Sequence, residues 1–178
     1  LWTVIGEFAD LQHNNMPEPD RSVDNTTIWV PDFSRDHYLD MLFAEGPGVN
    51  SMRNFYIEQS SNRYTVHGDV TDLVQVSGPA ASYDDDFNSP LGGNQVWYFL
   101  DETIDGWYAS QVAAGKTADE INKYLSQFDV WDRYDYDGDG NFDEPDGYID
   151  HAQFVHAGEG NEAGGGALGD CAIWSHSW

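Results

Sequence analysis

The sequence predicts a single α+β domain that spans residues 1–178. The first observation is size: 178 residues with 40% hydrophobic side chains suit one domain with a packed core. The second is that strand-like and helix-like segments are mixed without the regular strand–helix–strand rhythm of a doubly wound sheet. The third is that no segment repeats, which argues against propellers and repeat arrays. We therefore expect a mixed sheet with several helices.

Four segments of the first half have recognisable patterns. Residues 2–8 are rich in strand-forming side chains. Ser34 is placed to cap a helix whose apolar residues recur at helical spacing, and Asn50 or Ser51 is placed to cap a second. Apolar and polar residues alternate over 63–70, which predicts a half-buried strand. Aromatic residues on the helices, Phe55, Tyr56, Trp97 and Trp107, are expected in the core.

The second half adds two helices and a strand. A long helical pattern runs from Asn94 to about Val112, and Thr117 is placed to cap another helix that ends near Phe128. The run 148–155 is rich in strand-forming residues and predicts a strand, and the glycine-rich run 156–169 predicts a surface loop.

The charge balance argues against two classes of partner. The chain has 32 acidic and 7 basic residues and a net charge of −25. Such a surface repels nucleic-acid phosphates and anionic lipids, so we expect neither as a partner. No apolar run approaches the roughly 20 residues that a membrane span requires.

The sharpest local signal is an acidic loop over residues 135–146. Between residues 129 and 150 the chain has eight Asp and one Glu against one Arg, so the segment repels itself unless a cation binds. The spacing fits a twelve-residue calcium loop, with oxygen ligands at positions 1, 3 and 5, a glycine, Gly140, at position 6 for the sharp turn, a backbone carbonyl at 7 and further ligands at 9 and 12. The expected Ca²⁺ ligands are Asp135, Asp137, Asp139, Asn141, Asp143 and Asp146.

Two features qualify this calcium loop. Asp143 stands where such loops often bind through water, and Asp146 stands where the longer Glu is usual. Pro145 and the strand-like residues that follow it do not provide the exiting helix of an EF-hand. The alternative interpretation is a solvated acidic turn.

Several motifs together resemble one family. They are Val130-Trp-Asp-Arg-Tyr-Asp135, Asp146-Gly-Tyr-Ile-Asp-His151, Val155-His-Ala-Gly158, Gly164-Gly-Gly166 and Ile173-Trp-Ser-His176, with Phe33, His37-Tyr38 and Ser51-Met-Arg-Asn-Phe-Tyr56 upstream. The chain thereby resembles the immune inhibitor A family of secreted bacterial zinc metallopeptidases. The resemblance implies a zincin-like catalytic domain that is stabilised by calcium, acts on proteins or peptides and is extracellular.

The sequence departs from this family in its zinc motif. The family's H-E-x-x-H helix is expected after Trp-Ser-His, but the sequence ends at Trp178, and none of its six histidines has a histidine four residues on. We therefore expect no zinc ligands and no catalytic residues in this chain, which by itself is expected to be inactive. It would be the N-terminal half of a catalytic domain whose partner is the C-terminal fragment that binds Zn²⁺.

Three residues are candidates for contact with substrate. In the zincin plan an edge strand beside the zinc binds extended peptide, and residues 154–158 or 173–176 could supply it. His156, Gly158 and His176 are the candidate substrate-binding residues. For His156 the alternative is a histidine hydrogen-bonded within the end of the sheet. Glu159 and Glu162 are either cation ligands or solvated carboxylates. The alternative for the whole chain is a non-catalytic, calcium-binding adhesion or scaffold module.

Overall fold

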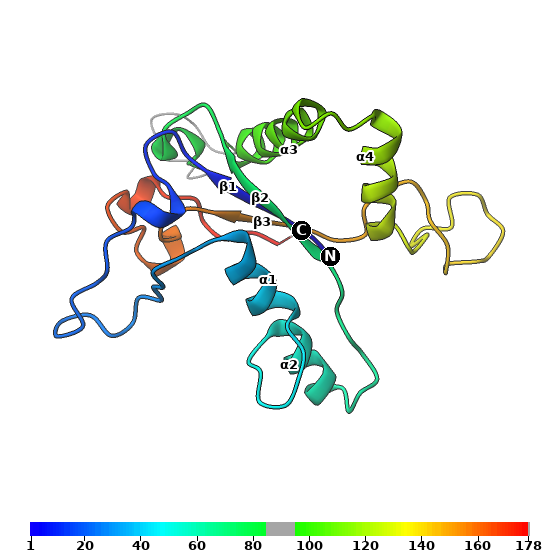
Figure 1. The fold of residues 1–178 in the computed structure, drawn as a ribbon, viewed down its shortest axis with the longest axis horizontal. Coiled ribbons are helices and arrows are strands. Elements are labelled where there is room, and N and C mark those ends of the chain that lie inside the picture. The colour runs from blue at the N-terminus through cyan, green and yellow to red at the C-terminus, as the bar shows by residue number, and fades with distance from the viewer. Residues whose placement is uncertain (85–94, 178) are drawn as a thin grey trace.

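A three-stranded parallel sheet organises the protein, whose computed structural model describes residues 1–84 and 95–177 (Figure 1). The strands are β1 (Trp2–Glu7), β2 (Asp69–Gln75) and β3 (Ala152–His156), in the order β2-β1-β3. Both pairings are parallel, with Trp2 opposite Asp69 on one side and Ala152 on the other. The combination of helices and a small sheet is compatible with the α+β prediction. The prediction of a mixed sheet was wrong for the described strands.

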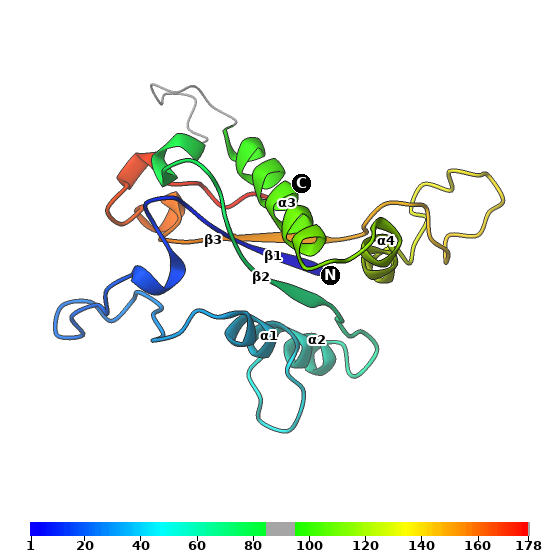
Figure 2. The same ribbon diagram turned by 45° about the horizontal axis from the view of Figure 1, so that its top comes forward.

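The helices cover both faces of this sheet. The connection from β1 to β2 contains α1 (Arg35–Phe43) and α2 (Met52–Gln59), and the connection from β2 to β3 contains α3 (Val96–Ala113) and α4 (Ala118–Leu125). Figures 1 and 2 show the first pair on one face and α3 on the other. The connection from β1 to β2 and the connection from β2 to β3 run across the sheet in opposite directions. Right-handed crossovers that run in opposite directions place their helices on opposite faces of the sheet. Short 3₁₀ turns occur at His13–Asn15, Ala80–Tyr83, Ser126–Phe128, Asn161–Ala163 and Gly169–Cys171.

The core lies on both sides of the central strand β1. Trp2 and Val4 point to the face that carries Trp107 of α3 and Ile121 of α4. Ile5 points to the opposite face, where it packs in a cluster with side chains of α1. Because β1 is buried on both faces, it reads in the sequence as a nearly continuous apolar run, as central parallel strands do.

The predicted helix caps are confirmed. Ser34 accepts a hydrogen bond from the backbone N–H of His37, and Ser51 accepts one from that of Asn54. At α4, Thr117 accepts from the N–H of Glu120 while the Glu120 carboxylate accepts from the N–H of Thr117, which forms a capping box. Each cap satisfies backbone groups that a helix end leaves free. Asn94, where we expected the α3 helix to begin, lies outside the described residues.

Two expectations about local structure were wrong. Strand β2 begins at Asp69 rather than near residue 63. Its pairing with β1 begins at Trp2, and the Leu1 ammonium group donates to the carbonyl of His67 just before it. In α2 the buried side chain is Asn54, whose amide donates to the carbonyls of Gly46 and Val49, while Phe55 and Tyr56 are exposed. Among the helix aromatics, Trp107 is buried as expected and Trp97 is exposed.

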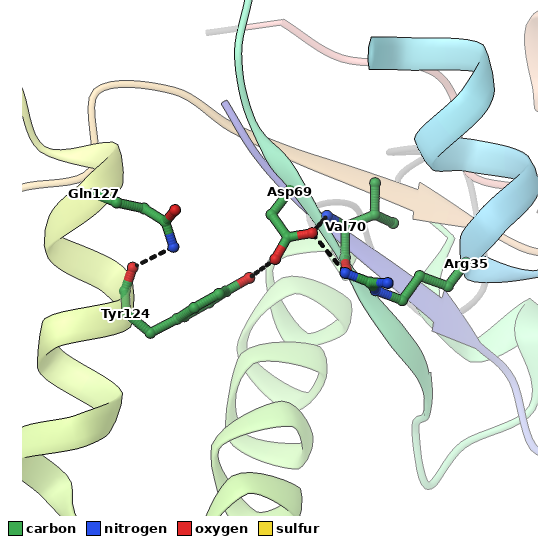
Figure 3. Close-up of polar contacts among 5 residues, drawn as sticks. All are labelled: Arg35, Asp69, Val70, Tyr124 and Gln127. Atoms are coloured by element: carbon green, nitrogen blue, oxygen red, sulfur yellow. Dashed lines mark hydrogen bonds and ion pairs between the residues drawn. The ribbon is translucent and has the colours of Figure 1, made fainter. Parts of the chain in front are cut away.

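A polar network ties the two helical layers together at the amino edge of the sheet (Figure 3). Arg35 of α1 lies 2.7 Å from Asp69 Oδ1 and also donates to the carbonyl of Val70. From the other layer, the Tyr124 hydroxyl of α4 donates to Asp69 Oδ2 at 3.0 Å. Burial, reinforced by the Asp69 charge, raises the pKa of Tyr124, so this hydroxyl stays a donor throughout the physiological range.

Replacing Asp69 by asparagine is expected to weaken this connection. The substitution removes the charge but keeps the shape, so Arg35 loses an ion pair and the Tyr124 hydroxyl loses a charged acceptor. Because the Arg35 and Asp69 side chains are 37% and 28% exposed, we expect a loss of only about 1 kcal/mol in the free energy of unfolding. Denaturant unfolding measures it. Asp72→Asn, on the same strand but exposed, is the matched control, and an equal loss there would contradict the role of Asp69.

No helix within residues 1–84 and 95–177 is both long enough and apolar enough to cross a membrane.

Candidate functional site

The acidic loop projects from the body of the protein between α4 and β3. It is the long yellow and orange excursion in Figure 1, and residues 129–151 contain no helix or strand. Its two ends are fastened by carboxylates. Asp129 accepts from the backbone N–H groups of Asp146 and Gly147, each at 2.9 Å, and Asp150 accepts from that of Val130. The base of the loop is therefore held by the protein itself.

The backbone inside the loop turns as its spacing predicted. Asp135 Oδ1 accepts a hydrogen bond from the N–H of Gly140 at 3.0 Å, which folds the first position back onto the sixth. Gly140 has φ of +84°, a conformation that glycine adopts without strain and other residues rarely adopt. Asp137 and Asp139 each accept from the N–H two residues further on. These turns hold the carboxylates of Asp135, Asp137 and Asp139 against the backbone of the loop.

Two groups of carboxylates converge in the loop. Oxygens of Asp132, Asp135 and Asp137 lie within 4.8 Å of one another, and so do those of Asp137, Asp139 and Glu144. Three predicted ligands, Asp135, Asp137 and Asp139, are thus brought together, with Asp137 common to both groups. Oxygen-only groups of this kind suit a hard cation such as Ca²⁺.

The other predicted ligands lie differently. The Asn141 amide donates to Glu144 at 2.8 Å, and its oxygen accepts from the N–H of Asp143, so Asn141 stays at the edge of the second group. Asp146 accepts from the N–H of Tyr148 at 2.8 Å. Neither Asp143 nor Asp146 belongs to a converging group.

The sequence analysis missed Asp132 and Glu144 as members of these groups. Asp132 is only 3% exposed and accepts from the backbone N–H groups of Tyr134 and Tyr136. It precedes the twelve-residue loop by three residues, so a fixed loop template omits it. Glu144 lies inside the template at a position without an assigned ligand. The only feature of the sequence that pointed to Glu144 as a member was that its side chain is longer than those of the aspartates around it.

A second place of interest is the carboxyl edge of the sheet, where β1 ends at Glu7 and β3 ends at His156. In open parallel sheets, ligands bind at the carboxyl ends of the strands, at the point where the connections from two neighbouring strands run to opposite faces of the sheet. His156 is half-buried: its ring packs near Phe8 and Phe99, and its Nδ1 lies 3.0 Å from the carbonyl oxygen of Ala157. This position is compatible with both interpretations made from the sequence.

Gly158 has a structural reason to be glycine. Its φ is +90°, and a Cβ there would lie 2.6 Å from Cδ2 of Leu11. It follows that the residue permits a close approach of the loop 8–12 to the end of β3.

The segment that carries His176 is anchored by Glu162. The Glu162 carboxylate accepts from the backbone N–H of Ser175 at 3.0 Å and from its hydroxyl, and these bonds, the hydroxyl first, lower the pKa of Glu162. Residues 173–176 form no strand, and Trp174 and His176 lie on an exposed stretch beyond buried Ile173. The suggestion that this segment supplies an edge strand was therefore wrong within the described part of the chain.

His13 is a buried polar residue that the sequence analysis did not single out. Its ring is 1% exposed and hydrogen-bonded on both nitrogens, to the Gly6 carbonyl and to the Tyr38 hydroxyl. Burial lowers the pKa of His13 to about 4. A lone histidine in a proline- and asparagine-rich loop gives no sequence signal of such a position.

The described residues do not fit a zinc site. Both converging groups found among residues 1–84 and 95–177 consist of carboxylates, without histidine or cysteine. Protein zinc sites use nitrogen and sulfur ligands, with carboxylates as additions.

Comparison with known proteins identifies the chain. The family model for the catalytic domain of immune inhibitor A peptidases, peptidase M6, matches residues 1–178. Immune inhibitor A of Bacillus thuringiensis subsp. alesti is 39% identical over 182 residues, which cover 98% of this chain and 25% of that protein. The pre-pro-metalloprotease PrtV of Vibrio cholerae serotype O1, from strain M66-2, is 39% identical over 160 residues, which cover 86% of this chain and 16% of that protein.

These matches define the class first: the chain is catalytic-domain sequence of a metallopeptidase family. More particularly, it belongs to the immune inhibitor A family, peptidase M6. The family resemblance inferred from the sequence is confirmed. The chain spans a quarter or less of the length of these relatives.

Proposed function

We propose that this chain is the N-terminal portion of the catalytic domain of a secreted, zinc-dependent endopeptidase with a zincin-like fold. The observation that carries the proposal is the match of all 178 residues to the catalytic-domain model of peptidase M6. The zinc-binding helix lies on a different segment, since the described residues lack a suitable ligand group. This chain supplies the wall on which a peptide substrate lies, and by itself it is inactive.

The partner of this chain is the C-terminal fragment of the same catalytic domain. Strand β3 supports this, because it pairs with β1 and with no other described strand. Its residues from Gln153 to His156 are only partly buried, although β1 beside them is almost completely buried. An edge strand with free N–H and C=O groups pairs readily with a further strand.

The carboxyl end of β3 is the proposed site of contact with protein or peptide substrates. An extended peptide can add to a sheet edge through backbone hydrogen bonds, which suits an enzyme that accepts varied sequences. His156 would face the bound peptide, and Gly158, whose conformation suits glycine, would contact it through its backbone. His176 would approach from the segment that Glu162 anchors.

The acidic loop is the proposed calcium site. Asp135, Asp137 and Asp139 would hold the ion together with Asp132 and Glu144, since these carboxylates form two converging groups that share Asp137. Asn141, Asp143 and Asp146 remain candidates that reach the ion by rearrangement or through water. When bound, Ca²⁺ neutralises carboxylates that otherwise repel one another, and it thereby stabilises the loop that leads into β3.

Peptidase activity tests the main proposal. The complete protein should cleave an unstructured protein substrate, lose activity with a zinc-selective chelator and regain it with Zn²⁺. Residues 1–178 expressed separately should be inactive. If the complete protein binds calcium but cleaves nothing, the alternative of a calcium-dependent adhesion or scaffold module is correct.

Terbium luminescence tests the calcium site. Tb³⁺ substitutes for Ca²⁺, and we expect Tyr136, which lies between two proposed ligands in the sequence, to sensitise its emission. We expect Ca²⁺ to displace Tb³⁺ and Asp137→Asn to weaken binding about 10-fold or more, because Asp137 belongs to both carboxylate groups. Asp105→Asn, an equal change of charge on an exposed face of α3, should leave binding unchanged. Equal affinity in both variants would contradict the assignment.

A further inference from the structure

A buried hydrogen-bonded chain joins three elements at the carboxyl edge of the sheet. His13 lies in the 3₁₀ turn that follows β1. Its Nε2 is 3.1 Å from the carbonyl oxygen of Gly6 in β1, and its Nδ1 is 3.0 Å from the hydroxyl of Tyr38 in α1. Its backbone N–H donates to Glu7 Oε1 at 2.9 Å. The histidine therefore connects the end of β1 to the helix that covers it.

The two ring contacts fix the protonation of His13. The Gly6 carbonyl can only accept, so Nε2 must bear the hydrogen, and Nδ1 must then accept from Tyr38. Tyr38 is suited to donate, because burial and the nearby Glu7 charge raise its pKa to about 12. The neutral imidazole thus satisfies both partners. An imidazolium would keep its bond to Gly6 but could donate to Tyr38 only after that hydroxyl had turned to accept, and its charge would be buried in a site that is 1% exposed.

The Gly6 carbonyl also holds the end of β3. It accepts from the backbone N–H of Ala157 at 3.2 Å, while Gly6 lies opposite His156 in the strand register. The Gly6 carbonyl oxygen is therefore shared by His13 and by Ala157, the residue between His156 and Gly158. Any movement of His13 acts on the segment proposed to contact substrate.

We propose that His13 is a positioning residue that, as a neutral imidazole, fixes the carboxyl end of β3 for peptide binding, and that its protonation releases this end. This inference rests on the proposed function, in which the carboxyl end of β3 contacts the peptide substrate. The titratable groups around the ring are Glu7 at the end of β1, Tyr38 on α1 and His156 on β3, with His37 packed against Tyr38. Glu7 is the acidic group among them, and its carboxylate is already engaged by the backbone of His13.

The direction of the pH dependence follows from burial. Burial lowers the pKa of His13 to about 4, an effect that His156 reinforces and the bond to Gly6 opposes. The unfolded chain, with a histidine pKa of about 6.5, therefore binds more protons than the folded protein between those values. The stabilisation is complete above about pH 6.5 and is lost progressively as the pH falls toward 4.

The test compares the complete protein with its His13→Gln variant from pH 4 to 8 in calcium-replete buffer. Glutamine can donate to Gly6 and accept from Tyr38 but cannot become charged. In the unaltered protein, KM for a peptide should rise about 2-fold as the pH falls to 4, where half of the His13 rings are protonated, and the thermal midpoint should fall. In His13→Gln both changes should be clearly smaller. His67→Gln, at an exposed histidine, should behave like the unaltered protein.

Two further measurements keep the outcome decisive. NMR of the His13 ring nitrogens in the unaltered protein should show the neutral form with its hydrogen on Nε2 down to about pH 5, and this readout stands even if His13→Gln does not fold. The thermal midpoint does not depend on catalysis, so it tests the histidine even if the protein proves not to be a peptidase. Parallel midpoint profiles in all variants would overturn the proposal. So would a KM profile that His13→Gln leaves unchanged in an active enzyme.

Discussion

Replacing Gly6 by alanine is expected to destabilise the protein strongly, because the core leaves no space for the added methyl group. Gly6 lies in the buried central strand, where a Cβ would overlap Cζ of Phe99, lie 2.7 Å from its Cε2 and lie 3.1 Å from the Thr103 hydroxyl. Both neighbours are themselves buried, so neither can move into solvent. We expect a loss of about 3 kcal/mol in the free energy of unfolding, measured by denaturant unfolding at neutral pH.

A compensating substitution tests the cause of this loss. Phe99→Leu removes part of the ring that a Cβ at Gly6 would overlap. Combined with Gly6→Ala, it should cost less than the sum of the two single substitutions, because the added methyl group then has space. Additive losses would mean that the alanine acts through Thr103 or the backbone and not through Phe99.

Removal of calcium is expected to have the second large effect. If the ion binds the folded protein alone, it contributes about 2.7 kcal/mol when its concentration is a hundred times its dissociation constant. Calcium-free buffer, with zinc held constant, should therefore lower the thermal midpoint of the complete protein by several degrees. Asp137→Asn should abolish most of this calcium-dependent difference, because Asp137 is the carboxylate shared by both groups.

The control for calcium removal is again Asp105→Asn. It should retain the full difference between calcium-containing and calcium-free buffer, because its side chain is on an exposed face of α3. A midpoint that does not change with calcium in any form of the protein would contradict a stabilising role for the loop.

The elements were predicted well where local chemistry determines them. Ser34, Ser51 and Thr117 begin helices because their side chains satisfy free backbone N–H groups within three residues, and this pattern is visible in the sequence. The parallel arrangement of the strands was not predicted. It depends on which strands pair across 67 and 150 residues of chain, and no local pattern records that choice.

The candidate site was predictable to a similar degree. The spacing of Asp135, Asp137 and Asp139 around glycine indicated converging carboxylates, because the ligand positions follow from one continuous turn. Asp132 and His13 were missed for a different reason. Their environment is created by segments that fold over them, so burial and partners appear only in three dimensions.

The central position of β1 has a consequence for how the molecule acquires its structure. Of the three described strands, β1 leaves the ribosome first and needs partners on both sides, and residues 152–156 are made last. Residues 1–75 contain β1, α1, α2 and β2 and can associate earlier as one crossover unit. In that unit one side of β1 stays unpaired until β3 has been made. Such distant pairing slows folding, because the entropy of closing a long loop is lost before any contact compensates for it.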